Sequence, residues 1–186
     1  MQAEVSHSFG KSLFVLGGAR SGKSRHAQAI AETAAGSATA SLVYVATAQA
    51  FDDEMHQRIA RHQCDRDARW RTVEAPIDLP GAMRDADGKG VVILVDCLTL
   101  WLSNLMLSEA DIGDASERLF ATLRVLEARV ILVSNEVGLG IVPENALARR
   151  FRDAAGLLHQ RLAAEVDAVD FVMAGLVQRW KHPTLC

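Results

Sequence analysis

The chain has 186 residues, of which 49% are hydrophobic and 23% are charged. These proportions are those of an ordinary folded domain, and they exclude a disordered or fibrous protein. A chain of this length is expected to bury about 70% of the surface of its unfolded state in one domain. The net charge of −3 excludes a strongly basic nucleic-acid-binding protein, although it leaves room for a local basic patch.

The N-terminal segment and the cysteines favour a cytoplasmic protein. The first residues are polar and lack the apolar core of a signal peptide, so we predict a flexible tail over residues 1–12 and a single domain over residues 13–186. No apolar run approaches the length of a membrane span. The cysteines, Cys64, Cys97 and Cys186, are too scattered for a disulfide framework or a zinc site, and they fit a reducing compartment.

Short apolar runs alternate along the chain with segments of helical period. Strands are predicted at Leu13–Leu16, Leu42–Ala46, Arg69–Val73, Val91–Val95, Val130–Val133 and Val169–Met173. Helices are predicted at Ser24–Ala35, Asp52–Asp65, Ile77–Ala86, Leu98–Leu107, Ala115–Glu127 and Glu144–Val166. This alternation predicts an α/β fold, in which a mostly parallel sheet carries helices on both faces.

A glycine-rich segment follows the first predicted strand and reads GGARSGKS, which fits the phosphate-loop motif G-x-x-x-x-G-K-[ST]. The strand before it and the helix after it are the context that this motif requires. In such a loop, Lys23 reaches the β- and γ-phosphates and the Ser24 hydroxyl binds Mg²⁺. The fold is therefore predicted to be P-loop NTPase-like, of the RecA-like type. The predicted phosphate-binding residues are Gly17, Gly18, Ala19, Arg20, Ser21, Gly22, Lys23 and Ser24.

A phosphate loop needs a carboxylate near its magnesium ion, and Asp96 is the candidate. It ends the buried run Val91–Val95, as the second phosphate-binding motif of such enzymes does. The alternative is a capping role for Asp96 at the helix that begins near Leu98. We favour the magnesium role because the phosphate loop creates the need for it. No Asn-Lys-x-Asp motif is present, which argues against a regulatory GTPase.

The second predicted helix carries a histidine between arginines. Met55, Ile59 and His62 share one narrow face, with Arg58 and Arg66 beside them. These cations could hold phosphate oxygens while a neutral imidazole attacks phosphorus. From the residues alone, a half-buried histidine on an amphipathic helix is the favoured interpretation.

Two further groups of residues allow a functional and a structural interpretation. Asn135, Glu136, Gly138 and Gly140 follow the fourth buried strand, where they either line a ligand crevice or form a flexible turn. The arginines of the last predicted helix either clamp phosphate or solvate the helix; they are Arg149, Arg150 and Arg152.

Several stretches together resemble the bifunctional adenosylcobinamide kinase / adenosylcobinamide-phosphate guanylyltransferase family of cobalamin biosynthesis. They are Gly17–His26, Tyr44–Gln49, Asp52–His62, Trp70–Glu74, Val95–Leu105 and Val133–Asp153. The most specific feature is the order of three motifs, the phosphate loop, R-I-x-x-H and S-N-E-V-G-x-G-I-V-P. The resemblance covers nearly everything after residue 12.

The resemblance implies two reactions. A nucleoside triphosphate, ATP or GTP, phosphorylates adenosylcobinamide with the help of Lys23, and GMP from GTP is then transferred to the new phosphate. This gives adenosylcobinamide-GDP and pyrophosphate. In the family the GMP passes through the histidine of R-I-x-x-H, which corresponds to His62 and replaces the structural interpretation above. The family also implies a homotrimer.

The resemblance places GTP and Mg²⁺ against residues from several segments. Mg²⁺ is assigned to Ser24 and Asp96. The residues expected at GTP, beyond those of the phosphate loop, are Ala46, Thr47, Ala48, Gln63, Cys64, Asp65, Arg66, Glu74 and Asp96. Two other hypotheses stay open, a P-loop kinase of another metabolite and a nucleotide-binding module without catalysis.

Overall fold

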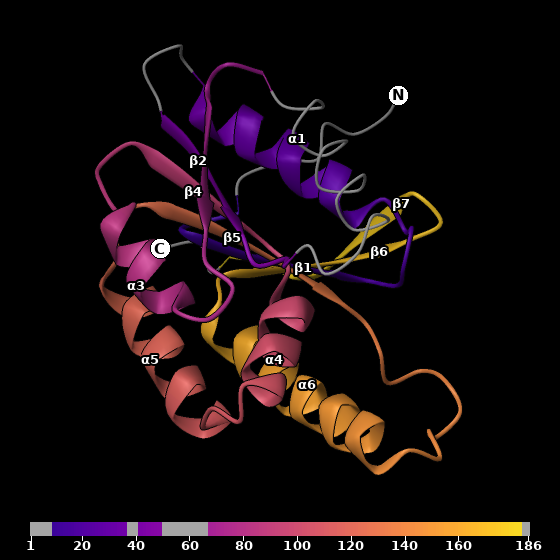
Figure 1. Cartoon of the computed structure of the whole chain (residues 1–186). Helices are drawn as coiled ribbons and strands as arrows, with labels where there is room; N and C mark the ends of the chain where they lie inside the picture. Colours follow the sequence, from indigo (N-terminus) through magenta and orange to yellow (C-terminus); the bar gives the residue numbers. More distant parts are fainter. Residues whose placement is uncertain (1–8, 37–40, 50–66, 184–186) are drawn as a thin grey trace.

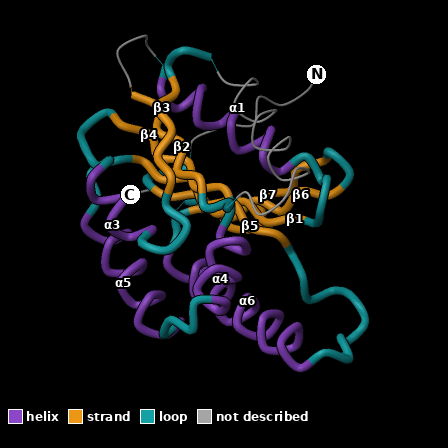
Figure 2. Tube along the Cα trace, viewed as in Figure 1, coloured by secondary structure: helices purple, strands orange, loops and turns teal. Residues whose placement is uncertain are grey.

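The computed structural model describes residues 9–36, 41–49 and 67–183. It has three layers, in which helix α1 covers one face of a central sheet and helices α3 to α6 cover the other (Figures 1 and 2). The strands are β1 (Ser12–Gly17), β2 (Ser41–Ala46), β3 (Trp70–Glu74), β4 (Val91–Asp96), β5 (Arg129–Asn135), β6 (Ala168–Met173) and β7 (Leu176–Lys181). The helices are α1 (Lys23–Ala35), α3 (Leu79–Asp85), α4 (Leu98–Leu107), α5 (Ile112–Val125) and α6 (Ala146–Glu165).

The described residues form one seven-stranded sheet with the order β3-β2-β4-β5-β1-β6-β7. All neighbouring strands pair in parallel except β6 and β7, which form an antiparallel hairpin. The predicted α/β fold with a mostly parallel sheet is therefore confirmed. The parallel strands β1, β2, β4 and β5 end at the same edge of the sheet as β6, so the loops that follow them are brought together there.

Capping side chains set the helix ends more sharply than the hydrophobic pattern does. Asp111 accepts a hydrogen bond of 3.0 Å from the Asp114 N–H, so α5 begins earlier than predicted. Asn145 accepts one of 3.1 Å from the Ala148 N–H, so α6 begins after the predicted start at Glu144. Both caps satisfy N–H groups that the first helical turn leaves without a backbone partner.

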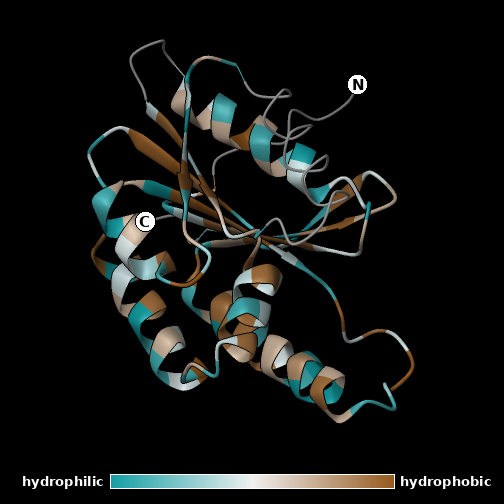
Figure 3. Ribbon diagram, viewed as in Figure 1, coloured by the Kyte–Doolittle hydropathy of each residue, from teal (hydrophilic) through white to brown (hydrophobic). Residues whose placement is uncertain are grey.

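Each face of the sheet has its own buried core, and Figure 3 shows the apolar strands between the helix layers. The core on the α3–α6 side includes Trp101, which is fully buried and donates from its indole nitrogen to the Ile77 carbonyl at 2.8 Å. The core on the α1 side is smaller and packs Ala27 and Ile30 against the strands. Apolar side chains are also exposed in the loop after β5, at Leu139, Ile141 and Val142.

The described part of the predicted tail packs against the domain. Phe9 is fully buried, with the Arg129 guanidinium 4.2 Å from the centre of its ring. The Asp167 carboxylate accepts hydrogen bonds from the N–H groups of Lys11 and Ser12, at 2.7 and 2.8 Å. The folded domain thus extends to Phe9, ahead of the predicted boundary after residue 12.

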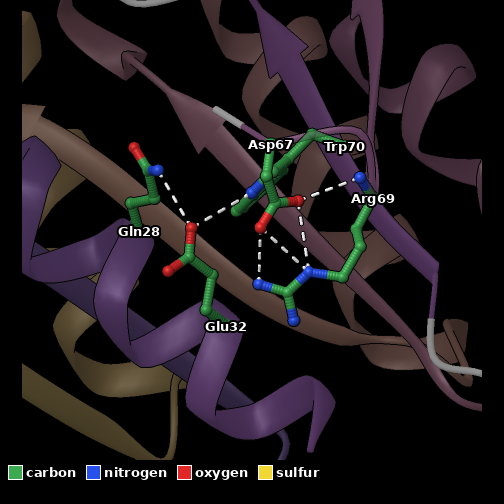
Figure 4. Close-up of polar contacts among 5 residues, drawn as sticks. All are labelled: Gln28, Glu32, Asp67, Arg69 and Trp70. Atoms are coloured by element: carbon green, nitrogen blue, oxygen red, sulfur yellow. Dashed lines mark hydrogen bonds and ion pairs between the residues drawn. The ribbon is translucent and has the colours of Figure 1, made fainter. Parts of the chain in front are cut away.

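Helix α1 is tied to the edge strand β3 by one carboxylate (Figure 4). Glu32 accepts hydrogen bonds from Gln28 at 3.0 Å and from the Trp70 indole nitrogen at 3.2 Å. Just before the strand, Arg69 and Asp67 form an exposed ion pair. The bond between Trp70 and Glu32 joins the edge strand β3, which is the strand farthest from β1, to the helix that follows the phosphate loop.

Candidate nucleotide-binding site

The phosphate loop connects β1 to α1 and is packed so closely that glycine is required at its start. A Cβ atom added to Gly17 would collide with the Val172 carbonyl oxygen of the neighbouring strand β6. Gly22 has a φ of 95°, in the left-handed region that glycine adopts without strain. The sequence motif and the backbone geometry therefore agree on the same two glycines.

Polar atoms of the loop are arranged around its own backbone. The Lys23 ammonium donates to the Gly18 carbonyl at 3.2 Å, and Lys23 is buried although it carries a charge. The Ser21 hydroxyl oxygen is buried and, among the described residues, has no hydrogen-bond partner. A buried hydroxyl without a partner is costly, and an anion in the loop would supply an acceptor for it.

Asp96 lies at the end of β4, on the same edge of the sheet as the loop. It pairs in register with Val133 of β5, which also pairs with Val15 of β1, two residues before Gly17. Helix α4 is capped by the backbone of Cys97 without a side-chain bond, so the alternative role of Asp96 as a helix cap is not observed.

The buried Cys97 thiol connects the two charges of the site. Burial makes the largest contribution and raises the pKa of the Cys97 thiol. The Asp96 carboxylate raises this pKa further, whereas the Lys23 ammonium lowers it. The thiol stays protonated and serves as a small packed group at the site.

The predicted magnesium ligands fit the donor set of that ion. Ser24 is in the first turn of α1 and Asp96 ends β4, and both side chains are partly accessible. Among the described residues there is no group of three or more His, Cys, Asp or Glu side chains that could hold a metal on their own. Mg²⁺ in phosphate loops needs few protein ligands, because phosphate oxygens and water complete its shell.

The segment after β2 plays a supporting role through Thr47. Its hydroxyl donates to the Cys97 carbonyl at 2.7 Å and accepts from the Cys97 N–H at 2.9 Å, and its own carbonyl accepts from Asn104 at 2.8 Å. Thr47 is fully buried, so its side chain holds the end of β4 in place. The predicted neighbours Ala46 and Ala48 lie at the same sheet edge and are partly accessible.

Glu74 lies far from the phosphate loop. It is exposed at the end of β3, and four strand spacings separate β3 from β1, or about 19 Å across the sheet. If Glu74 contacts the nucleotide, it must contact the end that carries the base and ribose.

The remaining predicted residues of the nucleotide site lie outside the residues that the structure describes. They are His62, Gln63, Cys64, Asp65 and Arg66, together with the predicted helix Asp52–Asp65.

The residues after β5 separate into different roles. Asn135 donates from its amide to the Thr99 hydroxyl at 2.9 Å, which joins it to the network around Cys97. The Glu136 N–H donates to the Gly17 carbonyl at 3.0 Å, while its carboxylate accepts from the Gly138 N–H and closes the turn. The segment thus forms a turn that also supports the phosphate loop through its backbone, and a role in lining a ligand crevice stays a prediction.

The arginines of α6 have structural partners in two of three cases. Arg149 donates to the Pro143 carbonyl at 2.9 Å, and Arg152 pairs with Asp153. Arg150 is exposed. Helix α6 also carries His159, which is bonded to Ser134 at 2.8 Å and whose pKa burial lowers to about 4.

Sequence reasoning missed the supporting residues Thr99 and Asn104 and the whole strand β7. The first two lie in the stretch VDCLTLWLSNL, where their polar character in an apolar helix was the available signal. Strand β7 is short and mostly exposed, so it lacks the apolar run by which the other strands were predicted.

The fold and the loop geometry define a P-loop NTPase-like protein with a RecA-like sheet. A crystal structure of the flagellar accessory protein FlaH from Methanocaldococcus jannaschii has the same fold, with a TM-score of 0.50 at 13% identity over 94% of this chain and 80% of that one. Among the described residues, no helix combines the length and apolar character needed to cross a membrane.

The chain belongs to the cobinamide kinase / cobinamide phosphate guanyltransferase family, whose model matches residues 13–180, and it is a transferase. The bifunctional adenosylcobalamin biosynthesis protein CobP of Pseudomonas aeruginosa is 48% identical over 87% of this chain and 92% of that protein. CobU of Salmonella typhimurium, which carries the same functional description, is 41% identical over 88% of this chain and 96% of that protein.

Proposed function

We propose that the chain phosphorylates adenosylcobinamide with a nucleoside triphosphate and then transfers GMP from GTP to adenosylcobinamide phosphate. The observation that carries the proposal is an intact phosphate loop, with Asp96 at the same sheet edge, in a chain of the cobinamide kinase / cobinamide phosphate guanyltransferase family. Family membership selects the substrates, and the loop supplies the phosphate chemistry.

In the first reaction the loop holds the β- and γ-phosphates while a substrate hydroxyl attacks the γ-phosphorus and gives up its proton to solvent. The bond between the γ-phosphorus and the β-phosphate oxygen breaks, and the nucleoside diphosphate leaves. The backbone N–H groups and the Lys23 ammonium stabilise the charge that develops on the phosphate oxygens. Mg²⁺ held by Ser24 and Asp96 would neutralise part of that charge when bound. Among these residues, Lys23 contributes most, because it is a buried cation already bonded to the loop.

In the second reaction His62 is the nucleophile. A bond forms between an imidazole nitrogen and the α-phosphorus of GTP, and the bond to the β-phosphate oxygen breaks to release pyrophosphate. A phosphate oxygen of adenosylcobinamide phosphate then attacks the same phosphorus, and the histidine leaves. The support for His62 is its place in the R-I-x-x-H motif of a family member.

The sheet also suggests how the nucleotide lies. The triphosphate is placed at the end of β1, between α1 and Asp96, and the nucleoside extends across the ends of β4 and β2 toward Glu74 at the end of β3. Gln63, Cys64, Asp65 and Arg66 are proposed to approach GTP together with His62. A homotrimer and a cytoplasmic location remain predictions from the sequence.

Mass spectrometry of the protein after incubation with GTP tests the covalent step. We expect a mass increase equal to a guanylyl group, that is, GMP less one water, and the linkage should be labile to acid and stable to base, as a phosphoramidate is. His62→Ala should remove the increase, whereas the matched variant His56→Ala in the same segment should keep it. Retention of GMP by His62→Ala would contradict the assignment of the nucleophile.

The kinase step is tested separately with cobinamide and each triphosphate. His62→Ala should keep the phosphorylation activity, because phosphate-loop chemistry does not need the imidazole. Lys23→Ala should lower it by about a thousandfold, the effect of losing a major charge-stabilising group. Phosphorylation of another small metabolite with none of cobinamide would favour a different P-loop kinase.

A further inference from the structure

We propose that the β6–β7 hairpin is a brace that turns the Gly22 amide of the phosphate loop toward the phosphates, with Asp170 as its anchor. This inference rests on the proposed binding of a triphosphate by the loop. It concerns residues that the proposed reactions do not otherwise use.

The tip of the hairpin contacts the phosphate loop directly. The Gly175 N–H donates to the Ser21 carbonyl at 2.8 Å. A Cβ atom placed on Gly22 would lie 3.5 Å from the Gly175 Cα, so the two backbones are in van der Waals range. The hairpin tip and the start of α1 lie side by side on the right of Figures 1 and 2.

This bond fixes the orientation of the peptide group between Ser21 and Gly22. In a trans peptide the C=O and the N–H point in opposite directions. Because the Ser21 carbonyl is held by the hairpin, the Gly22 N–H, which lies at the N-cap of α1, points away from the hairpin. That N–H is one of the groups by which the N-terminus of a helix binds phosphate.

The turn has the backbone that this contact needs. Ala174 and Gly175 both have positive φ, at 51° and 80°, as the central residues of a type I′ turn do. Such a turn matches the twist of the two strands, so only two residues connect β6 to β7 and the tip of the hairpin is short where it meets the phosphate loop. A Cβ added to Gly175 would meet no atom within 4 Å, so the glycine is required for its φ alone.

A hairpin at the edge of a sheet needs anchors to hold a fixed position. Asp170 of β6 is 1% exposed and accepts a hydrogen bond of 2.8 Å from His26 of α1. It also accepts two from Arg179 of β7. Although burial raises the pKa of Asp170, the bonds from His26 and Arg179 outweigh it, and the pKa lies below its ordinary value. One carboxylate thus fastens β7 to β6 and α1 to both.

Two further contacts hold the far end of β7. Trp180 stacks on Phe171 with ring centres 4.7 Å apart, and the Lys181 ammonium donates to the Ala163 and Ala164 carbonyls of α6. These contacts stabilise the hairpin but do not touch the phosphate loop. Asp170 and Gly175 are therefore positioning residues, which act on phosphate only through the loop backbone.

Two glycines of the chain allow a matched test. Gly175 and Gly90 both have a φ of 80° and open space where a Cβ would lie. Gly90, however, precedes the interior strand β4, at the end of the sheet opposite to the phosphate loop. Replacement by alanine imposes the same backbone strain on each, so both variants should lose the same few degrees of melting temperature. Only Gly175→Ala shifts a group that touches the phosphate loop.

Isothermal titration of the full chain with Mg²⁺ and inorganic tripolyphosphate, well below the melting temperature, measures the effect. Gly175→Ala should raise the Kd about tenfold, and Gly90→Ala should leave it within about twofold. Arg179→Met should act like Gly175→Ala, while Arg161→Met, which breaks the exposed pair with Glu117, should have no effect. Equal Kd values for Gly175→Ala, Gly90→Ala and the wild type would overturn the inference.

A second measurement uses the wild-type chain alone, so it does not depend on the variants folding. The Gly175 amide should be protected from hydrogen exchange before any nucleotide is added, because the brace is already formed. Exchange at the rate of an open turn would overturn the inference. Failure of the wild type to bind tripolyphosphate would contradict the proposed nucleotide binding itself, which separates the two conclusions.

Discussion

Two polar clusters stand behind the phosphate site, and they are built in different ways. The first is neutral: Thr47, Cys97, Thr99, Asn104 and Asn135 exchange hydrogen bonds around the end of β4. The second, behind the phosphate loop, is ionic and places one buried carboxylate between a histidine and an arginine. The neutral cluster costs little to bury but tolerates few changes of shape, whereas the ionic cluster depends on keeping all its charges paired.

The largest effect is expected from breaking the ionic cluster. Asp170→Ala leaves His26 and Arg179 without their buried acceptor, and should lower the free energy of unfolding by about 3–5 kcal/mol. Denaturation in urea measures the loss. The control is Glu117→Ala, which breaks an exposed pair with Arg161 and should cost less than about 1 kcal/mol. Equal losses would show that burial does not distinguish the two pairs.

Lowering the pH should destabilise the protein through the two clusters at different pH values. His159, bonded to Ser134 beside the neutral cluster, has a pKa lowered to about 4 by burial. Since its unfolded pKa is higher, the unfolded chain takes up the proton first, and stability falls as the pH drops from about 6.5 to 4, by up to roughly 3 kcal/mol. His159→Gln should remove this slope in urea titrations at each pH.

The carboxylate of the ionic cluster should respond at lower pH. The pKa of Asp170 is lowered in the folded state, so its contribution is complete above the unfolded value near 3.8 and is lost as the pH falls below it. If the free energy of unfolding of His159→Gln fell as steeply between about pH 6.5 and 4 as that of the wild type, groups other than His159 would be responsible for the loss in that range.

A smaller effect is expected from the neutral cluster. Thr47→Val keeps the shape of the side chain but leaves the buried Cys97 N–H without an acceptor, and should cost about 2 kcal/mol. Thr33→Val is the matched control, because Thr33 is exposed on α1 and its hydroxyl donates to the Ala29 carbonyl within the same helix. Its effect on urea denaturation should lie within about 0.5 kcal/mol.

The same contrast explains how much could be predicted from the sequence. The strands of the parallel core were predicted because each is a run of apolar residues, and Gly22 and Lys23 because the phosphate loop is a local motif. The hairpin strand β7 was missed because it is exposed and lacks such a run. Local hydrophobic patterns indicate which segments are buried. An exposed edge strand that is held by a few side-chain contacts therefore has no clear pattern in the sequence.

Contacts between distant residues were also beyond the sequence. His26 and Asp170 are 144 positions apart, and no periodicity relates them. A trace was present, because Asp170 is a charged residue inside the apolar run Val169–Met173. A buried charge needs a partner, but which partner it finds is decided by the order of strands in the sheet. The location of Asp96 at the carboxyl end of β4 could be predicted from the apolar pattern. The hydrogen bonds by which Thr47 holds the end of β4 could not be.

The position of β1 in the sheet has a consequence for synthesis on the ribosome. Its neighbours are β5 and β6, which leave the ribosome more than a hundred residues later. The phosphate loop therefore emerges well before the strands that flank β1, and it acquires its final shape only after they have been made. Nascent chains arrested before β6 should not bind nucleotide, even though they already contain the complete glycine-rich motif.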